Sequence, residues 1–206
     1  MIFRDRAYAG QRLAELLKPE FPISGYVVAI PRGGVPVALE IARALNLPLR
    51  LIFIRKIGHP INPEYAIGAV SDTNELLLEN KSIGQETLNE IKSRERKRID
   101  QMIQAFGNEL KSNEARNKTI LLVDDGIATG TCIELAIHCL RAMEVKSIWV
   151  TVPVSSLHGA KRIRSLSDKF FCLHESGQFT GIGAFYIHFE QLTDAQVREM
   201  LTEIRN

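Results

Sequence analysis

The sequence of 206 residues is poor in cysteine, and its few thiols follow no recognisable pattern. The three cysteines, Cys132, Cys139 and Cys172, form neither an even disulfide framework nor a C-x-x-C metal or redox spacing. Thiols used in this way suit a reducing compartment, so we expect a cytoplasmic protein.

Long apolar runs are also absent, because no stretch reaches the roughly 18 apolar residues that a membrane-spanning helix needs. The segment Met1 to Arg6 carries charges where a secretory signal would need apolar residues. We therefore expect no secretory leader and no membrane partner.

Neither charge sign predominates. The 26 basic residues nearly balance 24 acidic ones, for a formal net charge of +2, so the composition does not indicate a nucleic-acid-binding protein. With 45% hydrophobic residues and no internal repeat, the chain is long enough for one domain with a buried core. We expect a single domain over residues 1–206.

The apolar pattern alternates between helix and strand. Helical spacing of apolar residues predicts helices over 5–17, 35–45, 85–106 and 131–143, another between 154 and 170, and a last one over 194–204. Short apolar or β-branched runs predict strands over 25–30, 49–55, 119–123, 147–154 and 170–173, with a strand pair at 66–70 and 76–78. This order indicates an α/β fold with a doubly wound, mainly parallel sheet and one long inserted helix. In such sheets ligands bind beyond the carboxyl ends of the strands, so the loops after Ile30, Ile54 and Val123 should meet at one crevice.

The loop after the strand at 119–123 carries the strongest chemical signal. Asp124 and Asp125 precede a glycine-containing turn, and Thr131 opens the next predicted helix. Backbone N–H groups at a helix N-terminus, together with threonine hydroxyls, can bind a phosphate monoester. The carboxylates would repel that phosphate and are placed instead for ribose hydroxyls or for a divalent cation, held directly or through water. The simpler alternative is that they cap a helix while the glycine turns the chain.

This segment resembles the phosphoribosyl diphosphate signature of the type I phosphoribosyltransferases, in which two acidic and two mostly apolar residues precede Ala-Thr-Gly and a hydroxyl residue. The resemblance implies that Asp124 and Asp125 bind the ribose 2′- and 3′-hydroxyls and serve the Mg²⁺ cofactor. Cys132 stands where many members have threonine, so Thr131 is the substitute for that hydroxyl. The substrate-binding residues expected from this loop are Gly126, Ile127, Ala128, Thr129, Gly130, Thr131 and Cys132, of which Ala128 to Cys132 would cradle the 5′-phosphate.

Two further segments fit the same resemblance. After the first buried strand, Arg32, Gly33 and Gly34 would grip the leaving diphosphate, although taken alone they indicate only a turn with a solvated arginine. The stretch Ile54 to Val70 is similar to the Arg-Lys-x-Gly-x-Pro-x-Asn-Pro-Glu stretch of a subgroup of predicted phosphoribosyltransferases.

In that stretch Arg55 and Lys56, at a strand end, are the expected catalytic partners of the acid pair, because two cations can neutralise the departing diphosphate. The alternative interpretation is that Arg55 and Lys56 are two ordinary surface cations. Glu64 would approach the ribose or the nucleophile, or else cap the next element. The segment 92–98 carries five basic residues in seven and favours a solvated helix face, with site closure, dimer contacts or nucleic-acid binding as alternatives.

Residues 178–191 contain four aromatic residues and resemble the hood of the same subgroup and, distantly, of 6-oxopurine phosphoribosyltransferases. By that analogy Phe179 stacks on a nucleobase, whereas core packing is the simpler use of an aromatic cluster. Homodimer formation is implied by the family alone.

The function hypothesis is transfer of a 5-phosphoribosyl group from phosphoribosyl diphosphate to a nitrogenous acceptor such as a nucleobase, with release of diphosphate and with Mg²⁺ as cofactor. The rival from another class is a regulator that senses phosphoribosyl diphosphate or a nucleotide without turnover. Arg55 and Lys56 favour the enzyme, because a sensor needs no stabilisation of a leaving group. A Mg²⁺-dependent hydrolase would need more carboxylates than the acid pair provides.

Overall fold

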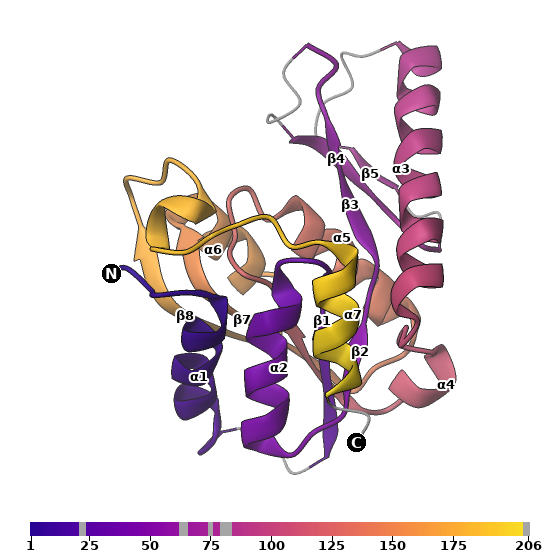
Figure 1. Cartoon of the computed structure of the whole chain (residues 1–206). Coiled ribbons are helices and arrows are strands. Elements are labelled where there is room, and N and C mark those ends of the chain that lie inside the picture. Colours follow the sequence, from indigo (N-terminus) through magenta and orange to yellow (C-terminus); the bar gives the residue numbers. More distant parts are fainter. Residues whose placement is uncertain (21–23, 62–65, 74–75, 79–83, 204–206) are drawn as a thin grey trace.

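The structure is a computed structural model that describes residues 1–20, 24–61, 66–73, 76–78 and 84–203. Its centre is a five-stranded parallel sheet with the order β2-β1-β6-β7-β8 (Figure 1). The strands are β1 (Gly25–Ala29), β2 (Leu49–Leu51), β6 (Thr119–Val123), β7 (Ser147–Ser156) and β8 (Lys169–Ser176). β6 is buried along its whole length, as expected for a central parallel strand whose residues are all apolar or β-branched.

Helices cover both faces of this sheet. One face packs against α1 (Arg6–Leu17), α2 (Gly34–Leu45) and α7 (Asp194–Thr202), and the other against α5 (Thr131–Ala142) and α6 (Leu157–Arg164). Residues alternate between the two layers along β6, with Leu121 and Val123 on the α1–α2 side and Ile120 and Leu122 on the α5 side. The predicted α/β fold with a mainly parallel, doubly wound sheet is confirmed.

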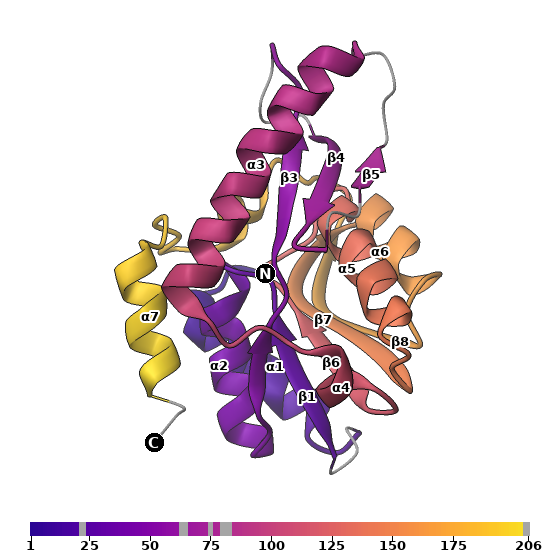
Figure 2. The ribbon, with the colours of Figure 1, turned by 90° about the vertical axis from the view of Figure 1, so that its right-hand side faces the viewer.

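A second, antiparallel sheet projects from the carboxyl end of the first (Figures 1 and 2). It consists of β3 (Ile54–Gly58), β4 (Ala66–Ser71) and β5 (Leu76–Leu78), and it is followed by the long helix α3 (Gln85–Phe106) and the short helix α4 (Ser112–Ala115). We call the described part of residues 54–106 the arm. The predicted strand pair and the predicted long helix both lie in it.

The prediction of one strand over 49–55 is wrong, because these residues belong to two strands of different sheets. β2 ends at Leu51 in the parallel sheet, and β3 begins at Ile54 in the arm. The linking residues Ile52 and Phe53 are fully buried. An uninterrupted apolar run hides the boundary, since both sheets bury the same kind of side chain.

The N-terminal residues pair with the segment that precedes α7. The N–H of Phe3 donates to the carbonyl of Phe185 at 2.8 Å, and the N–H of Ile187 donates to the carbonyl of Phe3 at 2.9 Å. The short helix η1 (Ile182–Phe185) belongs to this C-terminal segment, residues 178–192. Among the described residues, no helix has both the length and the apolarity to cross a membrane.

Candidate functional site

The acid pair stands at the carboxyl end of the central strand β6, as the sequence predicts. Asp125 is buried there, because only 7% of the residue is exposed. Its Oδ2 accepts a hydrogen bond from Nε of Arg6 at 2.7 Å, in an ion pair whose two side chains are 11% and 12% exposed. Asp124 is partly buried, and its Oδ1 accepts from the backbone N–H of Asp125 at 2.9 Å.

Arg6 is a site residue that the sequence analysis missed. It lies at the first position of α1, 119 residues before its carboxylate partner, so no local motif marks it. Its guanidinium lies 3.8 Å from the ring centroid of Phe189 and donates to the carbonyl of Glu190 at 3.1 Å. The Tyr186 hydroxyl also donates to the backbone carbonyl of Asp125 at 2.7 Å. The C-terminal segment, residues 178–192, thus contacts both Arg6 and the backbone of Asp125.

The electrostatics of the pair favour a bound cation. Burial raises the pKa of Asp124 well above its usual value, and the charge of Asp125 adds to the effect. Burial also raises the pKa of Asp125, although Arg6 opposes this. Among the described residues no three His, Cys, Asp or Glu side chains group as a metal site. Mg²⁺ commonly binds through one or two carboxylates plus substrate phosphates, so the acid pair fits it.

The predicted phosphate loop, residues 126–132, divides into two halves. In the first half the N–H of Ile127 donates to Val154 at 2.9 Å, and the carbonyl of Ala128 accepts from the Ser156 hydroxyl at 2.5 Å. A Cβ on Gly126 would lie 2.7 Å from Ile182. This half is therefore anchored to β7 and covered by the C-terminal segment.

The second half of the loop forms the N-terminus of α5. Gly130 caps the helix in the left-handed region at φ 86°, a conformation that favours glycine. The hydroxyls of Thr129 and Thr131 lie 2.8 Å apart, and Thr131 is buried. Cys132 packs against the apolar layer beneath α5. The hydroxyls and the helix terminus make this half the part suited to a phosphate.

The predicted diphosphate loop packs directly against the acid pair, so the loops after Ile30 and Val123 do converge. A Cβ on Gly33 would collide with the Asp125 carboxylate, and a Cβ on Gly34 would lie 2.7 Å from the carbonyl oxygen of Val123. The N–H groups of Gly34 and Val35 donate within the turn, to Ile30 and Arg32. The Arg32 side chain is therefore the group of this loop that is best placed to meet an anion.

Arg32 projects between two cavities. It donates to the carbonyl of Leu192 at 2.7 Å and lies 3.6 Å from the carboxylate of Asp194. One cavity, of about 210 Å³, is lined by Arg6, Arg32, Gly33, Asp125, Gln191 and Leu192. The other, of about 320 Å³, is lined by Arg32, Arg55, Arg98, Gln101, Met102 and Asp194.

We expect Gly34→Ala to lower the free energy of unfolding by about 2 kcal/mol, because the added methyl would press on the backbone of β6 rather than on a movable side chain. The control is Gly84→Ala at the start of α3, where an added Cβ meets nothing within 4 Å. Urea denaturation measures both variants. Equal stability of the two variants would contradict the close approach of α2 to β6.

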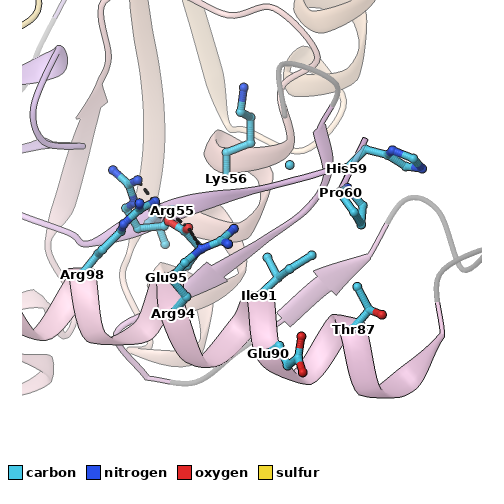
Figure 3. A pocket seen from close by; sticks show the side chains of 12 residues that line it. Arg55, Lys56, His59, Pro60, Thr87, Glu90, Ile91, Arg94, Glu95 and Arg98 are labelled. Carbon is cyan, nitrogen blue, oxygen red and sulfur yellow. Dashed lines mark hydrogen bonds and ion pairs between the residues drawn. The ribbon is translucent and has the colours of Figure 1, made fainter. Parts of the chain in front are cut away.

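Arg55 and Lys56 lie inside strand β3, not at the strand end that the sequence analysis assumed. Successive side chains of a strand point to opposite faces, and Figure 3 shows Lys56 directed away from the Arg55–Glu95 cluster. Nε of Arg55 donates to Oε2 of Glu95 at 3.0 Å. The two cations therefore do not form a side-by-side pair. Glu64 lies outside the described residues.

Arg94, Lys97 and Arg98 of the basic segment are exposed, as expected of a solvated face, but the segment also contains a buried carboxylate. Glu95 interrupts the apolar stripe and is only 3% exposed, with Arg55, Arg94 and Arg98 around it. Burial acts to raise its pKa, but hydrogen bonds from Arg98 and Arg55 and the charge of Arg55 outweigh this, so the pKa lies below its usual value. These residues line a groove of about 620 Å³ between β3 and α3 (Figure 3).

Phe179 packs within the C-terminal segment. Its ring stacks on Phe185 with the centroids 5.3 Å apart, and it lies against the cluster that contains Phe3 and Tyr186. Core packing thus explains the ring in this structure, and its predicted contact with a base stays a prediction.

Comparison with known proteins is consistent with this geometry. A family model described as the phosphoribosyl transferase domain matches residues 7–186. A protein of Mycobacterium tuberculosis (strain H37Rv) named "Putative phosphoribosyl transferase" is 28% identical over 201 residues, which are 95% of this chain and 45% of that protein. The chain thus spans about half the length of the curated relatives that it matches.

Two solved structures extend the comparison. The crystal structure of TT1426 from Thermus thermophilus is 33% identical, with a TM-score of 0.79 over 98% of this chain and 99% of that one. The purine phosphoribosyltransferase from Pyrococcus horikoshii is 13% identical, with a TM-score of 0.50 over 91% of this chain and 92% of that one. At that identity the second structure shows a shared fold alone.

Proposed function

The chain belongs to the phosphoribosyl transferase domain family, and on that premise we propose that it transfers a 5-phosphoribosyl group from phosphoribosyl diphosphate to a nitrogenous acceptor, with release of diphosphate. One observation carries this proposal. The acid pair is followed in the chain by the N-terminus of α5, and the Arg32 loop packs against its side chains. A ligand that matches this order has a phosphate at one end, sugar hydroxyls in the middle and a second anionic group beyond them.

Each part of the chain has a distinct task in this proposal. The N-terminus of α5, with Thr129 and Thr131, holds the 5′-phosphate. Asp124 and Asp125 accept hydrogen bonds from the ribose hydroxyls, which places the anomeric carbon toward Arg32. The Arg32 and Arg55 guanidiniums stabilise charge that develops on the departing diphosphate. Mg²⁺, held by Asp124 or Asp125 directly or through water, would supply further charge neutralisation when bound.

The acceptor that we propose is a nucleobase, on the support of the aromatic C-terminal segment. Phe179 and Phe185 form one stacked pair within it, and an aromatic face is the surface on which a planar base stacks. A nitrogen of the base would attack the anomeric carbon as the bond to diphosphate breaks. No covalent enzyme nucleophile is required for this displacement.

The test is a calorimetric titration of the protein with phosphoribosyl diphosphate and Mg²⁺, followed by a screen for diphosphate release with individual nucleobases. We expect saturable binding and release with one base, which would name the acceptor. Saturable binding without release for any base would favour the sensor, and the absence of binding would overturn both functions. Ribose 5-phosphate, which lacks the leaving group, is the control for release.

A further inference from the structure

We infer that helix α3 supplies a further diphosphate-binding residue, Arg98, and that the buried carboxylate of Glu95 holds its side chain in position. This inference rests on the proposed function, since it assigns an additional contact to the same ligand. It extends the site from the parallel sheet into the arm.

The cavity between the loop after β1 and helix α3 brings three arginines together from three separate elements. Arg32 comes from the loop, Arg55 from β3 and Arg98 from α3, and all three line the same space of about 320 Å³. Asp194 is the single carboxylate among the described lining residues. Counted with Asp194 and with Glu95, which pairs with Arg55 and Arg98, the three guanidiniums leave one net positive charge and several N–H donors for an anion.

This cavity and the smaller one beside the proposed ribose site have Arg32 as a common lining residue. Arg32 also lines the smaller cavity beside Asp125, so an anionic group that leaves a ribose bound at the acid pair passes Arg32 first. Arg55 and Arg98 stand beyond it. A diphosphate has enough oxygen acceptors to engage guanidiniums on more than one side.

Arg98 retains donors for such a ligand. Its Nη1 donates to Oε1 of Glu95 at 2.7 Å, and about half of the side chain, 51%, is exposed. A guanidinium has five N–H groups in a fixed planar fork. The bond to Glu95 therefore fixes the plane of the group while other N–H groups can bind an anion.

Glu95 joins two of the three arginines through its two oxygens. Oε2 accepts from Arg55 at 3.0 Å, and Oε1 accepts from Arg98 at 2.7 Å. A buried carboxylate at a position of an otherwise apolar stripe costs desolvation energy, which an apolar side chain would avoid. Its presence is explained if it orients guanidiniums of β3 and α3 toward one cavity. Glu95 is thus a positioning residue.

The chain offers a matched control in Arg94. Its Nε also contacts Oε1 of Glu95, at 3.3 Å, and it lies on the same helix one turn before Arg98. Arg94 lines the outer groove of the arm, however, and is not among the described residues that line the cavity shared by Arg32, Arg55 and Arg98. The two arginines therefore share their charge and their carboxylate partner but differ in access to the proposed diphosphate site.

The experiment compares Arg98→Gln with Arg94→Gln by calorimetric titration with diphosphate plus Mg²⁺ and, separately, with ribose 5-phosphate. We expect Arg98→Gln to raise the Kd for diphosphate about ten-fold, the effect of losing one charge-assisted hydrogen bond, and Arg94→Gln to leave it within about two-fold. The affinity for ribose 5-phosphate should be unchanged in both. Equal effects of the two substitutions, or no effect of Arg98→Gln, would overturn the inference.

Glu95→Gln tests the positioning role, because it keeps the shape of the side chain and removes the charge that orients both arginines. We expect the Kd for diphosphate to rise at least five-fold in the folded protein, on the order of one charge-assisted hydrogen bond, with ribose 5-phosphate unaffected. If Glu95 only supported the fold, Glu95→Gln would lower the free energy of unfolding and leave this Kd unchanged. A wild-type protein that binds neither probe would contradict the proposed function itself, whereas normal binding of both probes by Arg98→Gln contradicts this inference alone.

Discussion

Asp125→Asn is expected to lower the free energy of unfolding by about 2 kcal/mol, although the substitution removes a charge from a crowded acidic site. The larger of two opposing effects is the loss of the partner of Arg6, whose side chain is only 12% exposed, and an unpaired buried charge costs about 3 kcal/mol. Relief of the burial of the Asp125 charge, which raises the pKa of this carboxyl, and of its repulsion with Asp124 offsets part of this loss. Urea denaturation at neutral pH measures the balance.

A double-mutant cycle with Arg6→Gln isolates the ion pair. Each single substitution should destabilise the protein, and the double variant should lose at least about 1 kcal/mol less than the sum of the two, as is typical of directly contacting charges. Additive losses would show that Arg6 and Asp125 do not interact in solution. The free energy of unfolding of Arg6→Gln also reports the contact of Arg6 with Phe189, so this variant alone does not measure the pair.

The parts of the site that could be predicted from the sequence are those built from consecutive residues. The acid pair, the turn after it and the Gly33–Gly34 turn each place their chemistry within a few positions of a buried strand, and the structure brings them together. The fold was predictable for a similar reason, because alternating apolar periods identify strands and helices without knowledge of their partners.

The remaining parts depend on contacts between distant residues. Arg6 pairs with Asp125 across 119 positions, and Glu95 pairs with Arg55 across 40. In the sequence Arg6 is an ordinary cation in the first turn of a helix, and Glu95 is a break in an apolar stripe. A break in a stripe is a usable signal, since a charged residue at a buried position requires partners. The break at Glu95 is visible in the sequence, but the arginine of β3 that pairs with it is not.

Asp124→Asn should weaken the binding of phosphoribosyl diphosphate and stabilise the fold, whereas Asp125→Asn should destabilise it. We expect the Kd for phosphoribosyl diphosphate to rise roughly 100-fold, because a charge-assisted hydrogen bond to the ribose and the affinity for Mg²⁺ are both weakened. The free energy of unfolding should rise, because burial and the neighbouring Asp125 both raise the pKa of Asp124 and so disfavour its charged form in the folded protein. Calorimetric titration and urea denaturation measure the two quantities.

The matched control for this variant is Asp100→Asn on α3, an exposed carboxylate that pairs with Arg96 at 3.2 Å and lies outside the cavities of the site. It should change neither binding nor stability by more than about 0.5 kcal/mol.

Asp124→Asn should weaken the binding of ribose 5-phosphate as well as of phosphoribosyl diphosphate, whereas Arg98→Gln should leave the binding of ribose 5-phosphate unchanged. The two variants therefore separate the ribose site from the diphosphate site. If Asp124→Asn binds phosphoribosyl diphosphate as tightly as the wild type, the ribose assignment is wrong. If the variant loses both binding and stability, Asp124 also supports the fold. The repulsion between the two carboxylates would then be relieved in solution by a partner such as a bound cation.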